Sequence, residues 1–463
     1  MASVAPPRSP GKSRPRSSAR SKPPEKSKPP EKFEAVALLD GEAVEQVCRE
    51  LGYEWEEGGK LPPGKTLECL AWQVTMGNES LEAVARRHGG GFSAAALCKA
   101  RQRLPAGVLA EVSRRVAAHA AAAVGRDPRG QGLYNGRRVF RIDGTGISLP
   151  DSPAVRGHFG CSGRQKPGCG YPTAHLLVLT GPGGVAVEAV CSPLRTGDMT
   201  HASETHVHLR AGDVLLGDGL FGGWGHFYHL LGQKLEGLFP AHHSRKIGWG
   251  RNADHGKNRR FVKALGYGDQ LVEYRKPAGR PKWMGAKEFR DAPQWIAVRE
   301  IRREVKVGGV RRRVTVVTTL TDPVAHPAKG LVKLLGERWE IELDLRSLKT
   351  TMGMERLKCK SVEGVGKELL VYLIVYNLVK LLLAEAARRQ GVPLSRLSFA
   401  CALAVLRYGD GGVVAIKLLP LRPGRTEPRV VKRRPKHFPA MGRPRHVLRK
   451  LLLAKGKKAA GRG

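Results

Sequence analysis

The sequence is poor in acidic residues and has no long apolar run. It holds 41 Asp+Glu against 80 Lys+Arg, which gives a formal net charge of +39 at pH 7. No stretch of about 18 apolar residues is present that could cross a membrane, and residues 1–32 lack the apolar segment of a signal peptide. We therefore expect no membrane partner and a cytoplasmic, nucleoid-associated protein.

The eight cysteines include no CxxC pair, so the sequence offers neither a common zinc ribbon nor a disulfide framework. Reduced thiols are the expected state. One group has ligand types suited to zinc, namely His158, Cys161, Cys169 and His175. Because its spacing fits no common zinc finger, we favour small buried thiols and keep zinc as the alternative.

The excess of positive charge predicts a polyanionic partner. Lys and Arg side chains bind phosphates, and the counterions that they release supply most of the non-specific affinity for nucleic acid. Nucleic acid is therefore the first choice, while ribosomal-type packing and an anionic membrane surface are the alternatives. With 463 residues the chain can form a large core and about two to four domains.

Two short β-type runs end in aspartates. Residues 139–142 lead to Asp143, and residues 214–217 lead to Asp218. A glycine-containing hairpin is predicted at 176–191, a helix at 200–209 and a strand at 235–240. This order of three strands, helix, strand, helix and strand is that of an RNase H-like α/β core.

A third carboxylate, Glu342, lies on a predicted amphipathic helix that includes residues 334–349. Arg338 lies four residues before it and Lys349 seven residues after it, on a neighbouring stripe of the helix. On an ordinary surface helix such a pattern would only form ion pairs. Together with the two strand-end aspartates, it predicts a metal site built from three separated carboxylates.

The N-terminal part of the chain has helical periodicity and a basic helix. Ser93 is a typical N-cap residue after a glycine-rich turn, and Lys99, Arg101 and Arg103 follow it. The order of helix, glycine turn and basic helix is similar to a helix-turn-helix, in which these side chains would contact DNA. A helical bundle with a solvated basic face is the alternative.

Composition and periodicity divide the chain into six segments. In chain order we expect a disordered basic tail at 1–32, a helical DNA-binding domain at 33–130, the first part of the RNase H-like core at 137–243, a β-rich insertion at 244–325, the second part of the core at 326–415 and a basic tail at 416–463. Residues 369–384 are long and apolar but contain Asn377 and Lys380, so we interpret them as a core helix.

These motifs resemble the bacterial insertion-sequence transposases of the DDE class, IS-four type. The family signature Y-(2)-R-(3)-E-(6)-K is matched at Arg338, Glu342 and Lys349, but Leu335 occupies the tyrosine position. The aspartate motifs match as well, although relatives often have arginine where this chain has Gly219. Further similarity covers residues 99–105, 376–378 and 428–436.

The resemblance implies a transposase that binds terminal inverted repeats, pairs two ends in a homodimeric synaptic complex, and cuts and joins them to target DNA. Two Mg²⁺ ions, or Mn²⁺ in their place, would be held by Asp143, Asp218 and Glu342, because hard cations prefer carboxylate oxygens. Arg338 and Lys349 would grip phosphates near the reacting bond, or else position the glutamate.

Two other functions stay open. The chain could be a catalytically silent DNA-binding relic of a transposase, or an RNase H-like nuclease without strand transfer. On one continuous helix, a tyrosine at position 335 would share the face of Glu342 and reach a DNA phosphate, so Leu335 predicts slower strand transfer. For Trp283 and Trp295 of the insertion we favour core packing over stacking on a flipped DNA base.

Overall fold

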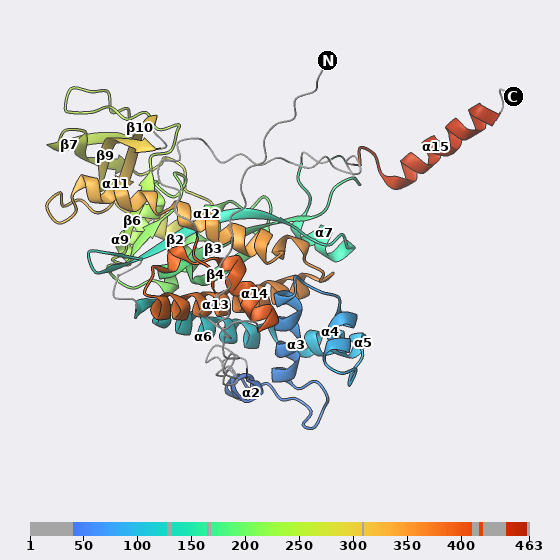
Figure 1. Cartoon of the computed structure of the whole chain (residues 1–463). Coiled ribbons are helices and arrows are strands. Elements are labelled where there is room, and N and C mark those ends of the chain that lie inside the picture. The colour runs from blue at the N-terminus through green and yellow to red at the C-terminus, as the bar shows by residue number, and fades with distance from the viewer. Residues whose placement is uncertain are drawn as a thin grey trace, which may run out of the picture. The chain divides into compact units, whose positions relative to one another are not determined.

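The computed structural model describes residues 40–126, 132–163, 166, 168–307, 310–409, 416–419 and 441–460. The predicted tail at 1–32 and the motif at 428–436 lie outside these residues. The described chain is a mixed α/β protein with one large sheet and helices packed against it (Figure 1).

Five helices form the N-terminal part of the described chain. They are α2 (Gly41–Glu50), α3 (Pro63–Thr75), α4 (Leu81–Arg87), α5 (Ala94–Arg103) and α6 (Ala106–Gly125). Ser93 caps α5 as predicted, since its hydroxyl accepts a hydrogen bond from the amide of Ala96 (3.1 Å). Lys99 and Arg103 share one exposed face of this helix, but Arg101 lies off it and is half-buried. The three basic side chains therefore do not form one surface.

The sheet has the strand order β4-β3-β2-β5-β6-β10-β9-β8-β7, and β1 pairs with β2. Its strands are β1 (Leu133–Tyr134), β2 (Arg137–Ser148), β3 (Thr173–Thr180), β4 (Ala186–Pro193), β5 (Val214–Leu216), β6 (Glu236–Pro240), β7 (Arg259–Gly266), β8 (Asp269–Arg275), β9 (Trp295–Val307) and β10 (Val310–Thr318). Strands β2, β5 and β6 are parallel, and the other pairs are antiparallel. The predicted hairpin is present as β3 and β4, and the predicted helix at 200–209 is a short α8 (Asp198–Ala202) followed by a 3-10 segment (Ser203–His208).

Strands of the predicted insertion extend the same sheet. Residues 316–318 of β10 pair with residues 238–240 of β6, and β9, β8 and β7 follow in order. Such a long-range pairing cannot be read from local periodicity. The insertion therefore shares its core with the strands that carry the two aspartates.

Both faces of the sheet are buried, because side chains along β2 alternate between two apolar clusters. Val139 packs on one face with Leu331, Leu334 and Leu335 of α11 (Ala328–Gly336). Phe140 and Ile142 pack on the other face with Trp224, Phe227 and Leu230 of α9 (Trp224–Gly232). The remaining helices are α7 (Pro153–Phe159), α10 (Ala286–Asp291), α12 (Trp339–Arg346), α13 (Val362–Gln390), α14 (Phe399–Tyr408) and α15 (Arg445–Ala460).

Helix α13 is a core helix, as predicted. It is long and apolar enough to cross a membrane, but 83% of its most apolar window is buried inside the protein. Neighbouring helices and the β3–β4 hairpin supply the apolar surroundings that a bilayer would otherwise provide. No disulfide bond joins any of the eight cysteines, all of which lie in the described part of the chain.

The prediction of one continuous helix around Glu342 was wrong. Helix α11 ends at Gly336, α12 begins at Trp339, and a π-helical turn (Ser347–Thr351) follows. At the junction the amides of Glu337 and Arg338 bond to carbonyls three residues back, at 2.9 and 3.1 Å. Consequently Leu335 faces the apolar cluster under the sheet, with 8% of its surface exposed, and does not share a helix face with Glu342.

Candidate active site

The prediction that both aspartates end strands agrees with Asp218, which follows β5, but is wrong for Asp143, which lies in the middle of the neighbouring parallel strand β2. In the register, Val139 is opposite Val214 and Arg141 is opposite Leu216, an offset of 75 residues that also relates Asp143 to Asp218. Neighbouring strands lie about 4.8 Å apart, and residues at the same register position point to the same face. The structure therefore brings the two predicted aspartates close together, near enough for the charge of Asp218 to act on Asp143.

The environment of Asp143 disfavours its charged form. Burial raises the pKa of this carboxyl to about 6, and the charges of Asp218 and Asp198 add to the rise, while the Gly144 amide and Arg338 oppose it. Among the described residues neither Asp143 nor Asp218 forms an ion pair with a cationic side chain. A divalent cation would relieve this repulsion.

The turn after Asp218 explains the glycine at position 219. The Asp218 carboxylate accepts a hydrogen bond from the Leu220 amide (2.8 Å), which closes a tight turn. A Cβ atom at Gly219 would lie 2.9 Å from the Cα of His242 and 3.2 Å from the carbonyl oxygen of Pro240. An arginine, which relatives often have here, would collide with the chain that leaves β6.

Arg141 holds the α11–α12 junction against the sheet. Its guanidinium is fully buried and donates to the carbonyl oxygen (3.0 Å) and the carboxylate (3.1 Å) of Glu337. It also pairs with Glu340 at 2.8 Å. Because Arg141 lies two residues before Asp143 on the same face of β2, it fixes where α12 begins relative to that aspartate.

Arg338 and Glu342 lie on this docked segment. A guanidinium nitrogen of Arg338 is 3.1 Å from Glu342 Oε1, and the Arg338 charge lowers the pKa of Asp143. Both side chains are half-buried. Arg338 therefore lies between Asp143 and Glu342.

Lys349 approaches β2 from the middle of the π-helical turn. Its ammonium group donates to Thr145 Oγ1 (2.9 Å) and to the Gly146 carbonyl oxygen (2.8 Å). The wider π turn brings this lysine to the strand two residues beyond Asp143. All five predicted site residues thus lie around the second half of β2 and the carboxyl end of β5.

A buried polar network secures α12 from behind. Asp344 accepts hydrogen bonds from Tyr376 (2.8 Å) and Lys380 (2.8 Å) of α13. Tyr376 also donates to the Gly184 carbonyl, and Asn377 exchanges hydrogen bonds with the backbone of Ala186 at 3.0 and 2.8 Å. The polar residues that interrupt the apolar helix therefore tie α12 and the β3–β4 hairpin to one scaffold.

The described residues contain no preformed group of three His, Cys, Asp or Glu close enough to hold a metal ion. Glu342 is engaged by Arg338, so it is not drawn toward the two aspartates in this structure. The donor set still suits a divalent cation, since Asp143 and Asp218 offer oxygens close together and burial disfavours the anionic form of Asp143. Glu342 would have to exchange Arg338 for the ion.

The alternative zinc group is not assembled. His175 pairs with Asp198 through Nε2 (2.6 Å), and Cys161 accepts a contact from Arg156 (3.0 Å). Within the described chain these four residues therefore do not form a metal site. Asp198 and His175 instead lie next to Gly144, and the sequence analysis missed them because no spacing links residues 143, 175 and 198.

The two insertion tryptophans differ. Trp283 packs against the apolar cluster beneath α9, as predicted. Trp295 is not in a core, because it is half-exposed and lies under the guanidinium groups of Arg260 (4.4 Å) and Arg275 (6.0 Å). The core prediction for Trp295 was therefore wrong.

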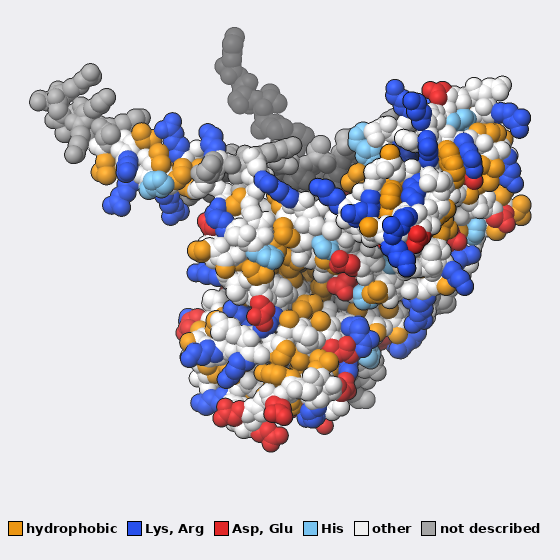
Figure 2. Space-filling view, turned by 180° about the vertical axis from the view of Figure 1, so that it is seen from behind, with side chains coloured by type: hydrophobic (Ala, Val, Ile, Leu, Met, Phe, Trp, Pro, Cys, Tyr) orange, Lys and Arg blue, Asp and Glu red, His pale blue; other side chains and the backbone are white. Residues whose placement is uncertain are grey.

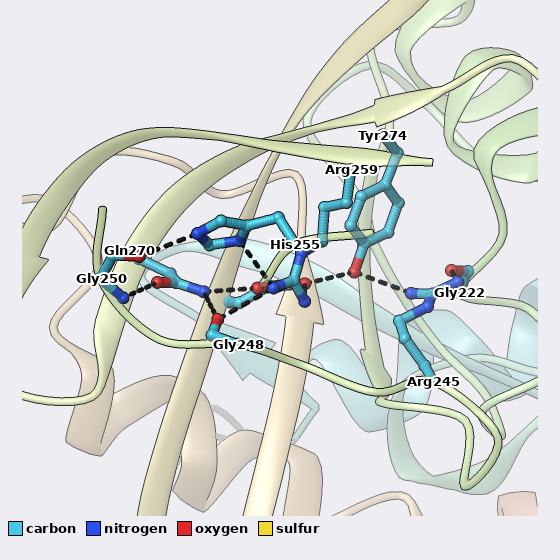
Figure 3. A network of polar contacts seen from close by, with 9 residues as sticks. Gly222, Arg245, Gly248, Gly250, His255, Arg259, Gln270 and Tyr274 are labelled. Carbon is cyan, nitrogen blue, oxygen red and sulfur yellow. Dashed lines mark hydrogen bonds and ion pairs between the residues drawn. The ribbon is translucent and has the colours of Figure 1, made fainter. Parts of the chain in front are cut away.

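Figure 3 shows how the insertion is joined to the turn after Asp218. Arg245 donates to the Gly222 carbonyl oxygen (2.9 Å) and to the Tyr274 hydroxyl (2.8 Å). Tyr274 donates in turn to Glu300 (2.9 Å), a fully buried carboxylate that also binds Arg259. These hydrogen bonds connect the insertion to Gly222, four residues after Asp218.

Basic side chains gather on the insertion. Figure 2 shows Lys and Arg concentrated over this part of the molecule, at the upper right. Exposed members are Arg251, Lys257, Arg260, Lys263, Arg275, Arg280, Lys282, Arg311, Arg312 and Arg313. The insertion therefore presents a positively charged surface.

Comparison with known proteins identifies a family and a relative. Residues 134–378 match the family described as transposase DDE domain. Over 200 residues the chain is 31% identical to transposase InsG for insertion sequence element IS4 of Escherichia coli (strain K12), covering 38% of this chain. The match spans 43% of that relative's length.

A solved structure, the piggyBac transposase synaptic complex with hairpin DNA, also aligns with the chain. It covers 81% of this chain and 77% of its own, with 11% identity and a TM-score of 0.39. A TM-score this low does not establish a common fold.

Proposed function

Because the chain belongs to the transposase DDE domain family, we propose that it is a DNA transposase that cuts and joins DNA with divalent metal ions. The observation that carries the proposal is the parallel register of β2 and β5, which relates Asp143 to Asp218. Arg338, Glu342 and Lys349 lie near these two strands, on the segment of α12 and the π-helical turn that contacts β2.

In this proposal Asp143, Asp218 and Glu342 hold two Mg²⁺ ions, with Mn²⁺ as an alternative metal. When bound, such a pair of ions activates the attacking oxygen and stabilises the departing one. Arg338 would leave Glu342 and bind a phosphate oxygen through its fork of N–H donors. Lys349, held at Thr145, would supply a fixed positive charge to the next phosphate.

The rest of the chain would bring DNA to this site. We assign an RNase H-like core to 137–243 and 326–415, with the insertion at 244–325 between them, and a helical DNA-binding domain to 33–130. Lys99 and Arg103 lie on an exposed face of α5. Together with Tyr53 and Trp55 they line a cavity of about 650 Å³. The substrates would be terminal inverted repeats and target DNA, bound by a homodimer in a synaptic complex in the cytoplasm at the nucleoid.

The relic interpretation loses its main support. It rested on Leu335, but this leucine belongs to the apolar cluster under the sheet, so its identity follows from packing. A nuclease without strand transfer stays as the second candidate, since the same carboxylates would serve hydrolysis.

The test uses the full-length protein and duplexes that carry the inverted repeats flanking its gene. With Mg²⁺ we expect cleavage at the repeat end and joining to a second duplex. Asp143→Asn, Asp218→Asn and Glu342→Gln should each abolish cleavage but retain binding in a mobility-shift assay. Cleavage without joined product would favour the nuclease, and near-normal cleavage by any variant would remove that residue from the metal site.

A further inference from the structure

A fourth carboxylate lies beside the site. Asp198, the first residue of α8, is mostly buried and pairs through Oδ1 with Nε2 of His175 on β3, at 2.6 Å. Their side chains are 18% and 16% exposed. No part of the proposed mechanism uses either residue.

This ion pair rests directly on Gly144. A Cβ atom built on that glycine would overlap the Asp198 carboxylate and lie 2.7 Å from His175 Nε2. Only a residue without a side chain permits this approach, so the glycine of the Asp-Gly motif is required by the pair. The Asp198 carboxylate thus lies against the residue that follows Asp143 and brings a negative charge near the proposed metal site.

The pair and Lys349 hold β2 from opposite sides. Side chains alternate along a strand, so the direction of a Cβ at Gly144 is opposite to that of Thr145, the partner of Lys349. The backbone that follows Asp143 is therefore clamped between the His175–Asp198 pair and the lysine.

We propose that Asp198 and His175 are positioning residues of the metal site. They fix the backbone that carries Asp143, and the Asp198 carboxylate adds negative charge that strengthens the binding of a divalent cation. This inference rests on the proposed metal site at Asp143 and Asp218. Groups that orient metal ligands in this way typically contribute about 10–100-fold to metal affinity or activity.

A direct metal titration tests the inference. The binding of Mn²⁺ to the full-length protein is followed by electron paramagnetic resonance, without relying on catalysis. Asp198→Asn preserves the shape of the side chain and removes its charge, and we expect Mn²⁺ affinity to fall about tenfold or more. His175→Gln keeps a donor near the position of Nε2 and should retain more affinity than His175→Phe.

A matched control is available on the same segment. His201 and Glu204 form a similar pair at 2.9 Å, but both side chains are more exposed, at 24% and 58%. Glu204→Gln should therefore leave Mn²⁺ binding unchanged. A purely structural role would lower the thermal stability of Asp198→Asn without changing its affinity when folded.

The outcomes separate the two proposals. Absence of saturable Mn²⁺ binding in the natural protein would overturn the metal site and with it this inference. Loss of binding in Asp143→Asn together with natural affinity in Asp198→Asn would overturn the positioning role alone. If Asp198→Asn does not fold, equal affinities of His175→Gln, His175→Phe and the natural protein would overturn it equally.

Discussion

At the scale of single residues, folding disfavours the charged form of the Asp143 carboxyl. Its folded pKa, about 6, lies above the ordinary value of 3.8. A raised carboxyl pKa contributes stability below the unfolded value, and this contribution is lost as pH rises through 6. Without metal at pH 8, Asp143→Asn should therefore be more stable than the natural protein, on the order of 2 kcal/mol.

Thermal unfolding at pH 5 and pH 8 checks this expectation. The difference between the two proteins should be smaller at pH 5 than at pH 8, and Mn²⁺ should raise the melting temperature of the natural protein only. A variant that is less stable than the natural protein at pH 8 would show that burial does not penalise this carboxylate.

Gly219 provides a second residue-scale prediction. Its missing Cβ leaves room for the backbone of His242, and backbone atoms cannot move aside cheaply. Gly219→Ala should cost about 1–3 kcal/mol of stability through overpacking. Gly232→Ala in α9, where nothing lies within 4 Å of the added atom, is the matched control. Equal denaturation midpoints for the two variants would contradict the close contact.

The five candidate site residues could be proposed from the sequence because each follows a local pattern. A short β-type run with an aspartate and a charged stripe on a helix both show in the order of residues, although β2 continues to Ser148, past Asp143. Asp198 and His175 could not be found, since only the pairing of β3 with β2 and the return of α8 bring them to Gly144. A tertiary contact of this kind leaves no periodic trace.

At the scale of elements, the break between α11 and α12 decides the role of Leu335. Apolar periodicity continues across residues 334–348, so sequence alone favours one helix. The helix is nevertheless interrupted, because Arg141 binds the carbonyl oxygen of Glu337 and the carboxylates of Glu337 and Glu340 at the junction. Local propensity is weak beside a buried, charged anchor of this kind.

This break changes the expected effect of Leu335→Tyr. A tyrosine would enter an apolar cluster that already holds Leu331 and Leu334, so we expect a loss of about 1–3 kcal/mol and no gain in strand transfer. Leu335→Met, which conserves volume, should cost less than about 1.5 kcal/mol. Faster joining of pre-cut ends by Leu335→Tyr would show that its hydroxyl reaches DNA.

The network behind α12 supports a prediction on the same scale. Lys380→Met would leave Asp344 buried without its cation, which typically costs about 3–5 kcal/mol. The double variant Asp344→Asn/Lys380→Met should recover much of this loss, since no unpaired charge is left. Urea denaturation of the single and double variants measures the coupling, and additive losses would mean that the pair does not interact.

At the scale of the whole molecule, charge and chemistry are carried by different parts of the chain. The acidic site lies around β2 and β5, whereas exposed Lys and Arg gather on the insertion and on α5. Composition predicted the polyanionic partner because net charge needs no fold. It could not predict that the insertion extends the sheet that carries Asp143, because the β6–β10 pairing joins residues about 80 positions apart in sequence.

Salt dependence should separate the parts that bind DNA by charge alone from those that select a sequence. Residues 1–32 contain nine Lys/Arg, and each phosphate contact contributes about 0.9 to the slope of log affinity against log salt. Deleting residues 1–32 should therefore lower affinity at low salt and reduce this slope, while the preference for the end sequence over random DNA survives. Lys99→Ala/Arg103→Ala should instead weaken that preference, since both side chains share the exposed face of α5. Fluorescence anisotropy at several salt concentrations, with end and random duplexes, compares the two variants. A truncated protein that no longer distinguishes the duplexes would assign sequence recognition to the tail and remove it from the helix.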